Sequence, residues 1–243
     1  MSLSAATVRL VLDPVLSVVF PSQCACCGQT VTRPTRGPLC EPCWAALPRH
    51  GCPLCRCGLP LPGRASACAR CRRGRNPIAA GASLGPYEGP LRTAIHELKY
   101  RGRRRVAGRL AEALLGRPEV TPVLGGGALL VPVPLHPRKR RERGFNQSEL
   151  LAEAISARAG VPLVKDALVR RRETGTQTGL SAAARRANVR GAFAVRRRAR
   201  IEGQRIVLLD DVYTTGATAL ACAQALLAAG AREVRLLTLA RVA

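Results

Sequence analysis

The sequence predicts an α/β protein in which an open, mainly parallel sheet follows a small cysteine-rich module. Ten of the 11 cysteines lie between Cys24 and Cys71. From residue 77 onward, stretches with strand and helix patterns alternate, and residues 205–218 read as a buried strand, a turn of small residues and a helix start. We therefore expect the 243 residues to form a module over 1–76 and an α/β domain over 77–243, with the boundary near Asn76.

The cysteines of the module form two quartets with the same spacing. Each quartet has two Cys-x2-Cys pairs separated by 12 residues, which predicts two tetrahedral four-cysteine zinc sites of the ribbon type. A redox or iron–sulfur site is the alternative. Cys26 and Cys57 fall outside this spacing, so each either replaces a neighbouring ligand or stays a free thiol, whereas Cys222 is expected in the core. The expected metal ligands are Cys24, Cys27, Cys40 and Cys43 in the first quartet and Cys52, Cys55, Cys68 and Cys71 in the second.

Zinc ribbons serve either as structural clips or as nucleic-acid binding modules. Arginines at 64, 70, 72, 73 and 75 crowd the second quartet, but Trp44 is the only aromatic residue near the two quartets. Because single strands are held by stacking on aromatic rings, the pattern favours a structural clip.

From residue 77 the elements follow in order. Pro stands at the first helical position of 90–100, where its missing N–H costs nothing, and Leu91, Ala94, Ile95 and Leu98 form one apolar face. His96, on the same helix, is read as a packing or capping residue. The predicted strands are 79–87, 128–133, 163–170, 205–211 and 234–240, and the predicted helices are 90–100, 106–115, 146–159, 181–188 and the stretch from 217 onward.

Residues 205–218 carry the strongest chemical signal of the chain. An apolar strand ends in Asp210 and Asp211, and a turn of threonines and glycine precedes the next helix. Free backbone N–H groups at a helix start favour a phosphate, and carboxylates beside it can accept hydrogen bonds from sugar hydroxyls. A buried strand followed by an ordinary capped helix is the alternative, but two acids at its end would be costly without partners. The pattern therefore favours a sugar phosphate site.

These residues resemble the phosphoribosyl-diphosphate (PRPP) motif of type I phosphoribosyltransferases. The resemblance implies that Asp210 and Asp211 hold the ribose hydroxyls and are the catalytic carboxylates. Thr214 stands where hypoxanthine-type enzymes have an acid, so the motif is closer to the orotate type. The residues implied in binding PRPP are Asp210, Asp211, Thr214, Thr215, Gly216, Ala217 and Thr218.

Two further segments fit the same resemblance. The loop after strand 128–133, with the basic run that follows it, is implied to bind diphosphate with Mg²⁺, while residues 171–180 resemble the mobile lid of these enzymes. About half of the basic run is expected to be solvated, since one ligand cannot engage every charge. The implied diphosphate ligands are Val133, Pro134, Leu135, His136, Arg138 and Lys139.

Nearly the whole chain is similar to ComF-like proteins, the competence-associated branch of this superfamily. The paired cysteines, ELKYRG, VPVPLHPRKRRERGFNQS, TGTQTGLSAAAR and LLDDVYTTGAT occur in the order of that family. The resemblance implies a double zinc ribbon joined to a phosphoribosyltransferase-like domain with a link to DNA uptake. The sequence ends soon after the last predicted strand, so the zinc module is the segment expected to contact an acceptor.

Composition and charge leave two functions open. Thirty-nine Lys and Arg against 15 Asp and Glu make a net charge of +24, and 47% hydrophobic residues exclude global disorder. The charge favours an anionic partner, although GC-rich coding sequence explains an arginine-rich chain equally well. The first hypothesis is phosphoribosyl transfer from PRPP to an unidentified acceptor, and the second is a non-catalytic accessory protein that binds single-stranded DNA or the competence machinery.

The expected location is the cytoplasm. Residues 1–20 are apolar, but Arg9, Asp13 and Pro14 interrupt them and no small-residue cleavage site follows, so they read as an amphipathic helix and not as a signal sequence. No stretch reaches the roughly 18 uninterrupted apolar residues of a membrane span. Reduced thiols are expected in the cytoplasm, which suits metal ligands.

Overall fold

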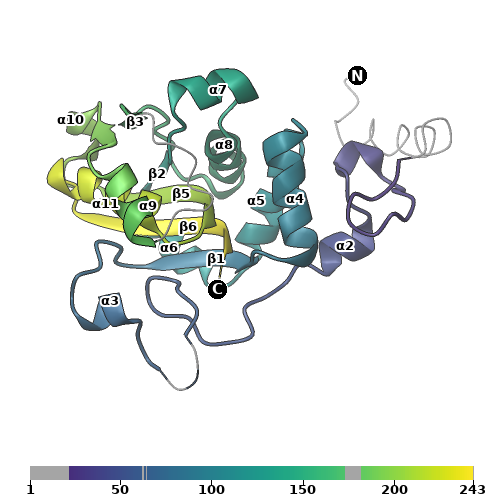
Figure 1. Ribbon diagram of the computed structural model, residues 1–243, viewed down its shortest axis with the longest axis horizontal. Coiled ribbons are helices and arrows are strands. Elements are labelled where there is room, and N and C mark those ends of the chain that lie inside the picture. Colours follow the sequence, from purple (N-terminus) through teal and green to yellow (C-terminus); the bar gives the residue numbers. More distant parts are fainter. Residues whose placement is uncertain (1–21, 62, 64, 173–181, 243) are drawn as a thin grey trace.

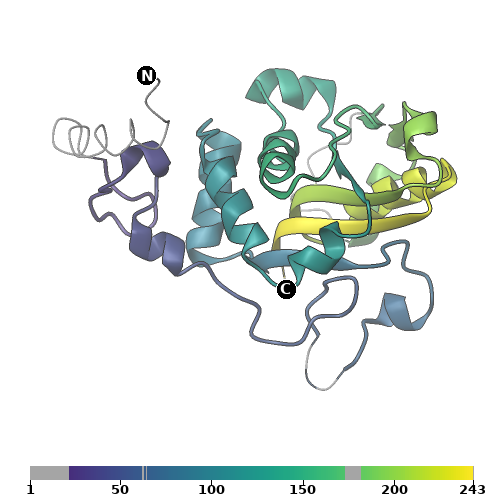
Figure 2. The same ribbon diagram turned by 180° about the vertical axis from the view of Figure 1, so that it is seen from behind.

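The computed structural model describes residues 22–61, 63, 65–172 and 182–242, and it shows an α/β domain with the cysteine-rich module wrapped around one edge of its sheet (Figures 1 and 2). In chain order the elements are η1 (Pro34–Arg36), α2 (Glu41–Ala45), α3 (Ala69–Arg72), β1 (Gly81–Pro86), α4 (Gly89–Tyr100), α5 (Val106–Leu115), α6 (Val120–Leu124), β2 (Leu129–Pro132), α7 (Pro137–Arg143), α8 (Gln147–Ala159), β3 (Leu168–Arg170), α9 (Ala182–Val189), β4 (Phe193–Val195), α10 (Arg198–Ile201), β5 (Arg205–Tyr213), α11 (Ala217–Ala228) and β6 (Glu233–Arg241). Within the described ranges, none of these helices has the length and apolar character that a membrane crossing requires.

The main sheet has four parallel strands in the order β1-β6-β5-β2. The β5 strand lies inside the sheet, paired with β6 on one side and β2 on the other. Because all four strands run in the same direction, their carboxyl ends meet at one edge, and the loops that follow β2 and β5 are brought together there.

Side chains of β5 alternate between two hydrophobic cores, one on each face of the sheet. Val207 and Leu209 join the core formed with α4, α5, α6 and α8, while Ile206 and Leu208 join the core formed with α11. Successive side chains of a strand point to opposite faces of the sheet. Because both faces of β5 are buried, its sequence is a continuous apolar run. Figures 1 and 2 show α11 and α9 on the side of the sheet opposite α4, α5 and α8.

Most predicted elements are confirmed, and one strand differs in its pairing. Instead of one strand over residues 163–170, Leu163 makes a single parallel bridge to Leu130, and only β3 at the end of the segment is a strand. β3 pairs in antiparallel fashion with β4, a strand that sequence patterning missed because it has three residues. The predicted cap of α9, Ser181, lies outside the described residues.

The basic run after β2 forms a helix, α7, which the sequence pattern does not predict. Pro137 stands in its first turn, and the His136 side chain accepts a hydrogen bond from the backbone N–H of Arg138. Gly144 ends the helix with a left-handed backbone, φ 75°. Proline at the start and glycine just past the end are the usual boundaries of a helix, so the local sequence accounts for this element.

The cysteine-rich module contributes to both cores of the α/β domain. Cys40 and Trp44 belong to the core on the α4–α5 face, whereas Cys55, Cys57 and Leu61 belong to the core on the α11 face. In Figure 1, α2 accordingly lies next to α4 and α5, and α3 lies below the sheet on the other side. The boundary near Asn76 stays a prediction, but the packing places the two halves of the module on opposite faces of the same sheet.

Between its two halves, the module runs along the edge strand β1. Arg117 holds it there by donating to the carbonyls of Leu84 and Pro48, at 3.1 and 3.2 Å. His50 bonds the Ser83 hydroxyl at 2.7 Å, and the N–H of Gly81 donates to the Arg56 carbonyl. An exposed edge strand is a template for association with other chains, and this segment covers it.

Candidate functional site

Asp211 is held in place by two side chains from two helices of one face. It is 5% exposed, and its Oδ1 lies 2.9 Å from Nζ of Lys99 on α4. The Gln147 side-chain amide, at the start of α8, donates to Oδ2 at 2.6 Å. Burial lowers the pKa of Lys99, but the Asp211 carboxylate more than compensates and the pKa is raised. Lys99 therefore stays charged, and Asp211 has partners for both oxygens.

Asp210 differs from Asp211 because it also lines a second, smaller pocket at the start of α11 and because its charge is less well compensated. Its Oδ1 accepts from the backbone N–H of Asp211 at 2.9 Å and from the Ser148 hydroxyl at 3.5 Å. Burial, together with the negative charge of Asp211, raises the pKa of Asp210 to about 7, and Lys99 opposes the shift. The pair thus combines a carboxyl group held by Lys99 and Gln147 with a second one, Asp210, whose pKa is raised toward neutral pH.

The segment Phe145–Ser148 explains how the acid pair is positioned. Asn146 caps α8, since its Oδ1 accepts from the backbone N–H of Ser148, while its Nδ2 donates to the carbonyl of Val133 at 3.0 Å. The residues next to this cap, Gln147 and Ser148, reach the two carboxylates. One short segment therefore ties the loop after β2 to the end of β5.

The turn after β5 forms a small cradle at the start of α11. Gly216 caps the helix with φ 74°, and a Cβ at this position would clash with the Tyr213 hydroxyl, so the turn requires glycine. Thr215 Oγ1 is buried and has no hydrogen-bond partner among the described residues. A pocket of about 50 Å³ lies here, lined by Asp210, Val212, Tyr213, Thr214, Gly216, Ala217, Thr218 and Ala219. Thr214 carries a hydroxyl in the wall of this pocket, and the N–H groups of a helix start are donors for an anion.

A larger pocket of about 410 Å³ joins the acid pair to the loop after β2. It contains most of the residues that the sequence placed in the site: Val133, Pro134, Leu135, Lys139, Asp210, Asp211, Thr214 and Thr218. His136 and Arg138 are not among its lining residues, because the His136 ring is used to cap α7 and Arg138 pairs with Glu142 at 3.0 Å. The remainder of the wall is formed by Tyr87, Lys99, Tyr100, Arg143, Gln147, Ser148, Arg170 and Val212.

Lys99 and Gln147 are the important residues that sequence reasoning missed. Lys99 lies four residues after the buried Ile95, so it falls on the apolar face of α4, where a lysine needs a partner. A lysine on the apolar face of a predicted helix was therefore the signal that could have identified Lys99. Gln147 follows a capping asparagine and carries no comparable signal. The predicted lid at 171–180 lies outside the described residues, apart from Arg171 and Arg172.

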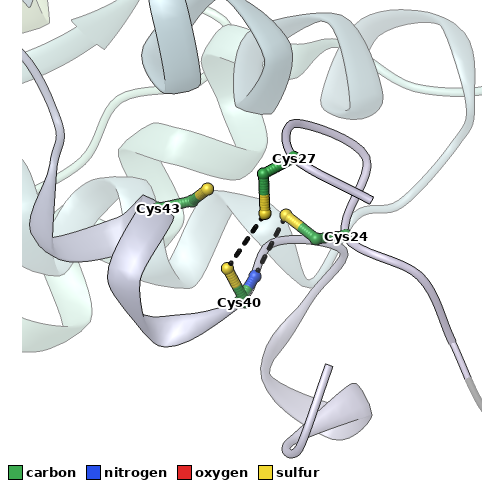
Figure 3. A group of neighbouring side chains, drawn as sticks. All are labelled: Cys24, Cys27, Cys40 and Cys43. Carbon is green, nitrogen blue, oxygen red and sulfur yellow. Dashed lines mark hydrogen bonds between the residues drawn. The ribbon is translucent and has the colours of Figure 1, made fainter. Parts of the chain in front are cut away.

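The first cysteine group is the one that the spacing predicts. The sulfur atoms of Cys24, Cys27, Cys40 and Cys43 lie within 4.8 Å of one another, and Figure 3 shows them converging on a common centre. Gly28, with φ 76°, completes the turn after the first pair. Burial would raise the pKa of Cys24, but backbone N–H groups that include those of Cys27 and Cys40 lower it to about 6. This thiol is therefore prepared to bind a metal as thiolate.

The second group corrects the prediction at one ligand. Cys55, Cys57, Cys68 and Cys71 come together, whereas Cys52 is exposed and outside the group. The reason is a turn one residue shorter than in the first group, because Gly58, with φ 77°, follows Cys57 as Gly28 follows Cys27. The Cys-Gly pair was therefore a better marker of the ligand than the Cys-x2-Cys spacing.

The two groups otherwise have equivalent geometry. The backbone N–H of Cys40 donates to Cys24 Sγ at 3.3 Å, and that of Cys68 donates to Cys55 Sγ at 3.4 Å. Burial is again outweighed by backbone donors at Cys55, where the pKa is lowered to about 7. Four sulfurs within reach of one centre suit tetrahedral zinc. Cys26 is exposed outside both groups, and Cys222 is buried in the core as expected.

Fold and site together define a phosphoribosyltransferase-like α/β domain that follows a double zinc ribbon. Residues 146–243 match the family described as phosphoribosyl transferase domain, and residues 15–72 match the double zinc ribbon domain. The chain is 35% identical to the DNA utilization protein YhgH of Salmonella typhimurium, over 92% of this chain and 99% of that protein.

Two competence proteins are similar over most of their length. Competence protein F of Haemophilus influenzae is 30% identical, over 84% of this chain and 90% of that protein. Competence protein ComFC of Bacillus subtilis is 30% identical, over 84% of each chain. The chain belongs to the ComF-like family.

Proposed function

We propose that the protein binds the phosphoribosyl group of PRPP, together with Mg²⁺, and transfers it to an acceptor. The observation that carries this proposal is the paired carboxylate at the end of β5, with Asp211 fixed by Lys99 and Gln147, directly beside the glycine-capped start of α11. This arrangement offers acceptors for ribose hydroxyls next to donors for a 5-phosphate. The match to a phosphoribosyl transferase domain supports it.

In the proposed reaction, the acceptor's lone pair forms a bond to the anomeric carbon while the bond from that carbon to diphosphate breaks. The electron pair leaves with the diphosphate, and the acceptor gives up a proton. Mg²⁺ bound with the diphosphate would supply charge compensation for the leaving group. Asp210 accepts from the ribose, Thr214 to Thr218 hold the 5-phosphate, and Lys139 and Arg143 in the pocket wall attract the diphosphate.

Calorimetric titration with ribose 5-phosphate or PRPP, each with Mg²⁺, tests binding. We expect the wild type to bind and Asp210→Asn to bind at least ten-fold more weakly, since it loses a charged acceptor. Gly216→Ala should abolish binding because its Cβ would meet the Tyr213 ring. Gly160→Ala is the matched control, since Gly160 also has a positive φ, 67°, but ends α8 at its far end from the acid pair. A wild type that binds neither compound would contradict the proposal.

A second candidate function is binding of single-stranded DNA, with a role in DNA uptake. A groove of about 940 Å³ lies between α3 of the module and α11, and its wall includes Arg70, Arg73, Arg75, Arg190 and Phe193. Four arginines along one groove suit a phosphate backbone, and the names of the relatives, DNA utilization and competence proteins, support the same function. The cytoplasm, where thiols stay reduced, is the proposed location for both functions.

Fluorescence anisotropy with a labelled oligonucleotide tests this second candidate. Binding should weaken steeply from low to physiological salt, because each neutralised phosphate releases counterions. The double variant Arg70→Gln/Arg73→Gln should reduce the dependence of the affinity on salt concentration. Arg197→Gln should not, because Arg197 is an exposed residue at the start of α10 and lies outside the groove. An oligonucleotide affinity that does not change with salt concentration would contradict DNA binding in this groove.

A further inference from the structure

Arg241 connects the second cysteine group to the end of the main sheet. It is the last residue of β6, it is 1% exposed, and its Nη2 donates to the backbone carbonyl of Cys57 at 2.9 Å. Its guanidinium carbon lies 4.4 Å from the centre of the Tyr213 ring. One buried side chain therefore touches a zinc-ribbon ligand and the residue that precedes the phosphate-binding turn.

Tyr213 carries this contact onward to the turn. It is paired in register with Arg241 across β5 and β6, and its carbonyl accepts from the backbone N–H of Val242 at 2.9 Å. Its hydroxyl packs so closely on Gly216 that no Cβ could fit there. The position of the Tyr213 ring therefore sets the position of the residue that caps α11.

Among the described residues, no carboxylate lies within 4.0 Å of the Arg241 guanidinium. A buried cation without compensation is costly. Four thiolates around one divalent zinc ion leave a net negative charge, and Cys57 belongs to such a group directly beside the guanidinium. A metal ion in this group also fixes the turn that carries the Cys57 carbonyl, so Arg241 loses a rigid acceptor when the metal is removed.

An arginine also packs beside the first cysteine group, but it does not contact the turn at the start of α11. Arg109 lies 4.9 Å from the Trp44 ring, but it forms an ion pair with Glu41 at 3.0 Å and therefore carries its own carboxylate. It belongs to α5, on the face of the sheet opposite α11. It makes a matched control, since it supports a ribbon without contacting the phosphate-binding turn.

We propose that Arg241 is a positioning residue that couples the second zinc ribbon to the phosphate-binding turn through Tyr213. Metal in the second group strengthens binding of the phosphoribosyl group, and the bound group in turn strengthens retention of that metal, as linkage requires. The inference rests on the proposed binding of a phosphoribosyl group. The second ribbon thus supports binding of the phosphoribosyl group, and the first ribbon does not.

Zinc competition on the full chain, loaded with two ions, tests the coupling. A chromogenic chelator is titrated against the protein with and without saturating ribose 5-phosphate, and calorimetry measures ribose 5-phosphate binding separately. We expect ribose 5-phosphate to increase the affinity for one of the two zinc ions by roughly ten-fold and to leave the affinity for the other unchanged. Ribose 5-phosphate should bind correspondingly more weakly once one ion has been removed.

Three variants separate coupling from general damage. In Arg241→Gln both ions should still bind, but ribose 5-phosphate should no longer tighten either, whereas Arg109→Gln should keep the full effect. Tyr213→Phe, which retains the ring contact with Arg241 but loses the hydroxyl that packs on Gly216, should weaken the effect. Equal tightening in wild type and Arg241→Gln would overturn the inference while leaving the proposed function intact. Absence of ribose 5-phosphate binding to the wild type would overturn both.

Discussion

At the residue scale, the two neighbouring aspartates have separate tasks because their surroundings differ. Asp211 faces Lys99 and Gln147, and its contacts resemble those of a buried structural anchor. Asp210 lines both pockets, and its raised pKa shows that its charge is poorly compensated without a ligand. A ligand hydroxyl or a cation would supply what Asp210 lacks.

Ligand binding should therefore depend on pH through Asp210. Its pKa is raised from 3.8 to about 7, so the carboxylate form becomes dominant only above neutral pH. We expect Mg²⁺-dependent affinity for ribose 5-phosphate to increase by up to roughly ten-fold between pH 6 and pH 8. Calorimetry across this range measures it, and Asp210→Asn should show only the titration of the ligand's own phosphate. An identical pH profile in both proteins would contradict the assignment.

The same pKa makes an opposite prediction for folding stability. Between about pH 4 and pH 7 the folded state keeps a proton on Asp210 that the unfolded state has lost, so this residue's contribution decreases as the pH rises through that window. The Lys99–Asp211 ion pair limits this loss of stability at neutral pH, because the Lys99 ammonium compensates the charge of one of the two aspartates.

Removing Lys99 should show how much that pair matters. Lys99→Met would leave Asp211 buried with one partner, and we expect a loss of about 3 kcal/mol in the free energy of unfolding at pH 7. Urea denaturation measures it. Lys99→Met/Asp211→Asn, which removes both charges, should lose less than the single variant, and a larger loss in the double variant would contradict the pairing.

At the scale of elements, each ribbon consists of a glycine-ended turn followed by a short helix that begins at a cysteine. Cys40 caps α2 and Cys68 caps α3 with nearly the same backbone angles, φ −70° in both and ψ 160° and 159°. The turns differ by one residue in length, which moves the ligand from Cys52 to Cys57. The repeat is therefore structural even where the spacing of the cysteines is not.

Zinc content tests this ligand assignment. Cys57→Ser should reduce bound zinc from two ions per chain to about one, because the second group loses a thiolate. Cys52→Ser should leave two, since Cys52 is exposed and outside the group. Metal analysis of the purified variants decides between Cys57 and Cys52, and loss of an ion in Cys52→Ser alone would identify Cys52 as the ligand.

At the scale of the whole molecule, the ribbons and the α/β domain share their hydrophobic cores. One ribbon adds to each core, and the segment between them covers the edge strand β1. A module that buries the edge of a sheet stabilises that sheet as well as itself. The second ribbon is also connected to the end of the sheet through Arg241, which donates to the Cys57 carbonyl and lies against the Tyr213 ring.

Chelation should consequently destabilise the whole molecule. We expect EDTA to lower the midpoint of the single thermal transition, followed by far-UV circular dichroism, by on the order of 10 °C or more, because structural zinc contributes free energy directly to folding. Adding zinc back should restore it. An unchanged transition of the α/β domain in EDTA would show that the module is an independent unit.

Local sequence patterns are enough to predict the α/β class, the place of the acid pair before the turn of small residues at the start of α11, and the first cysteine group. These features depend on local patterns: a period of two, a glycine turn, and ligands a few residues apart. The folded molecule alone reveals that Lys99 and Gln147 hold Asp211 and that the two ribbons lie on opposite faces of the sheet. Those contacts join segments far apart in the chain, and no local pattern encodes which distant side chain will lie within hydrogen-bond distance.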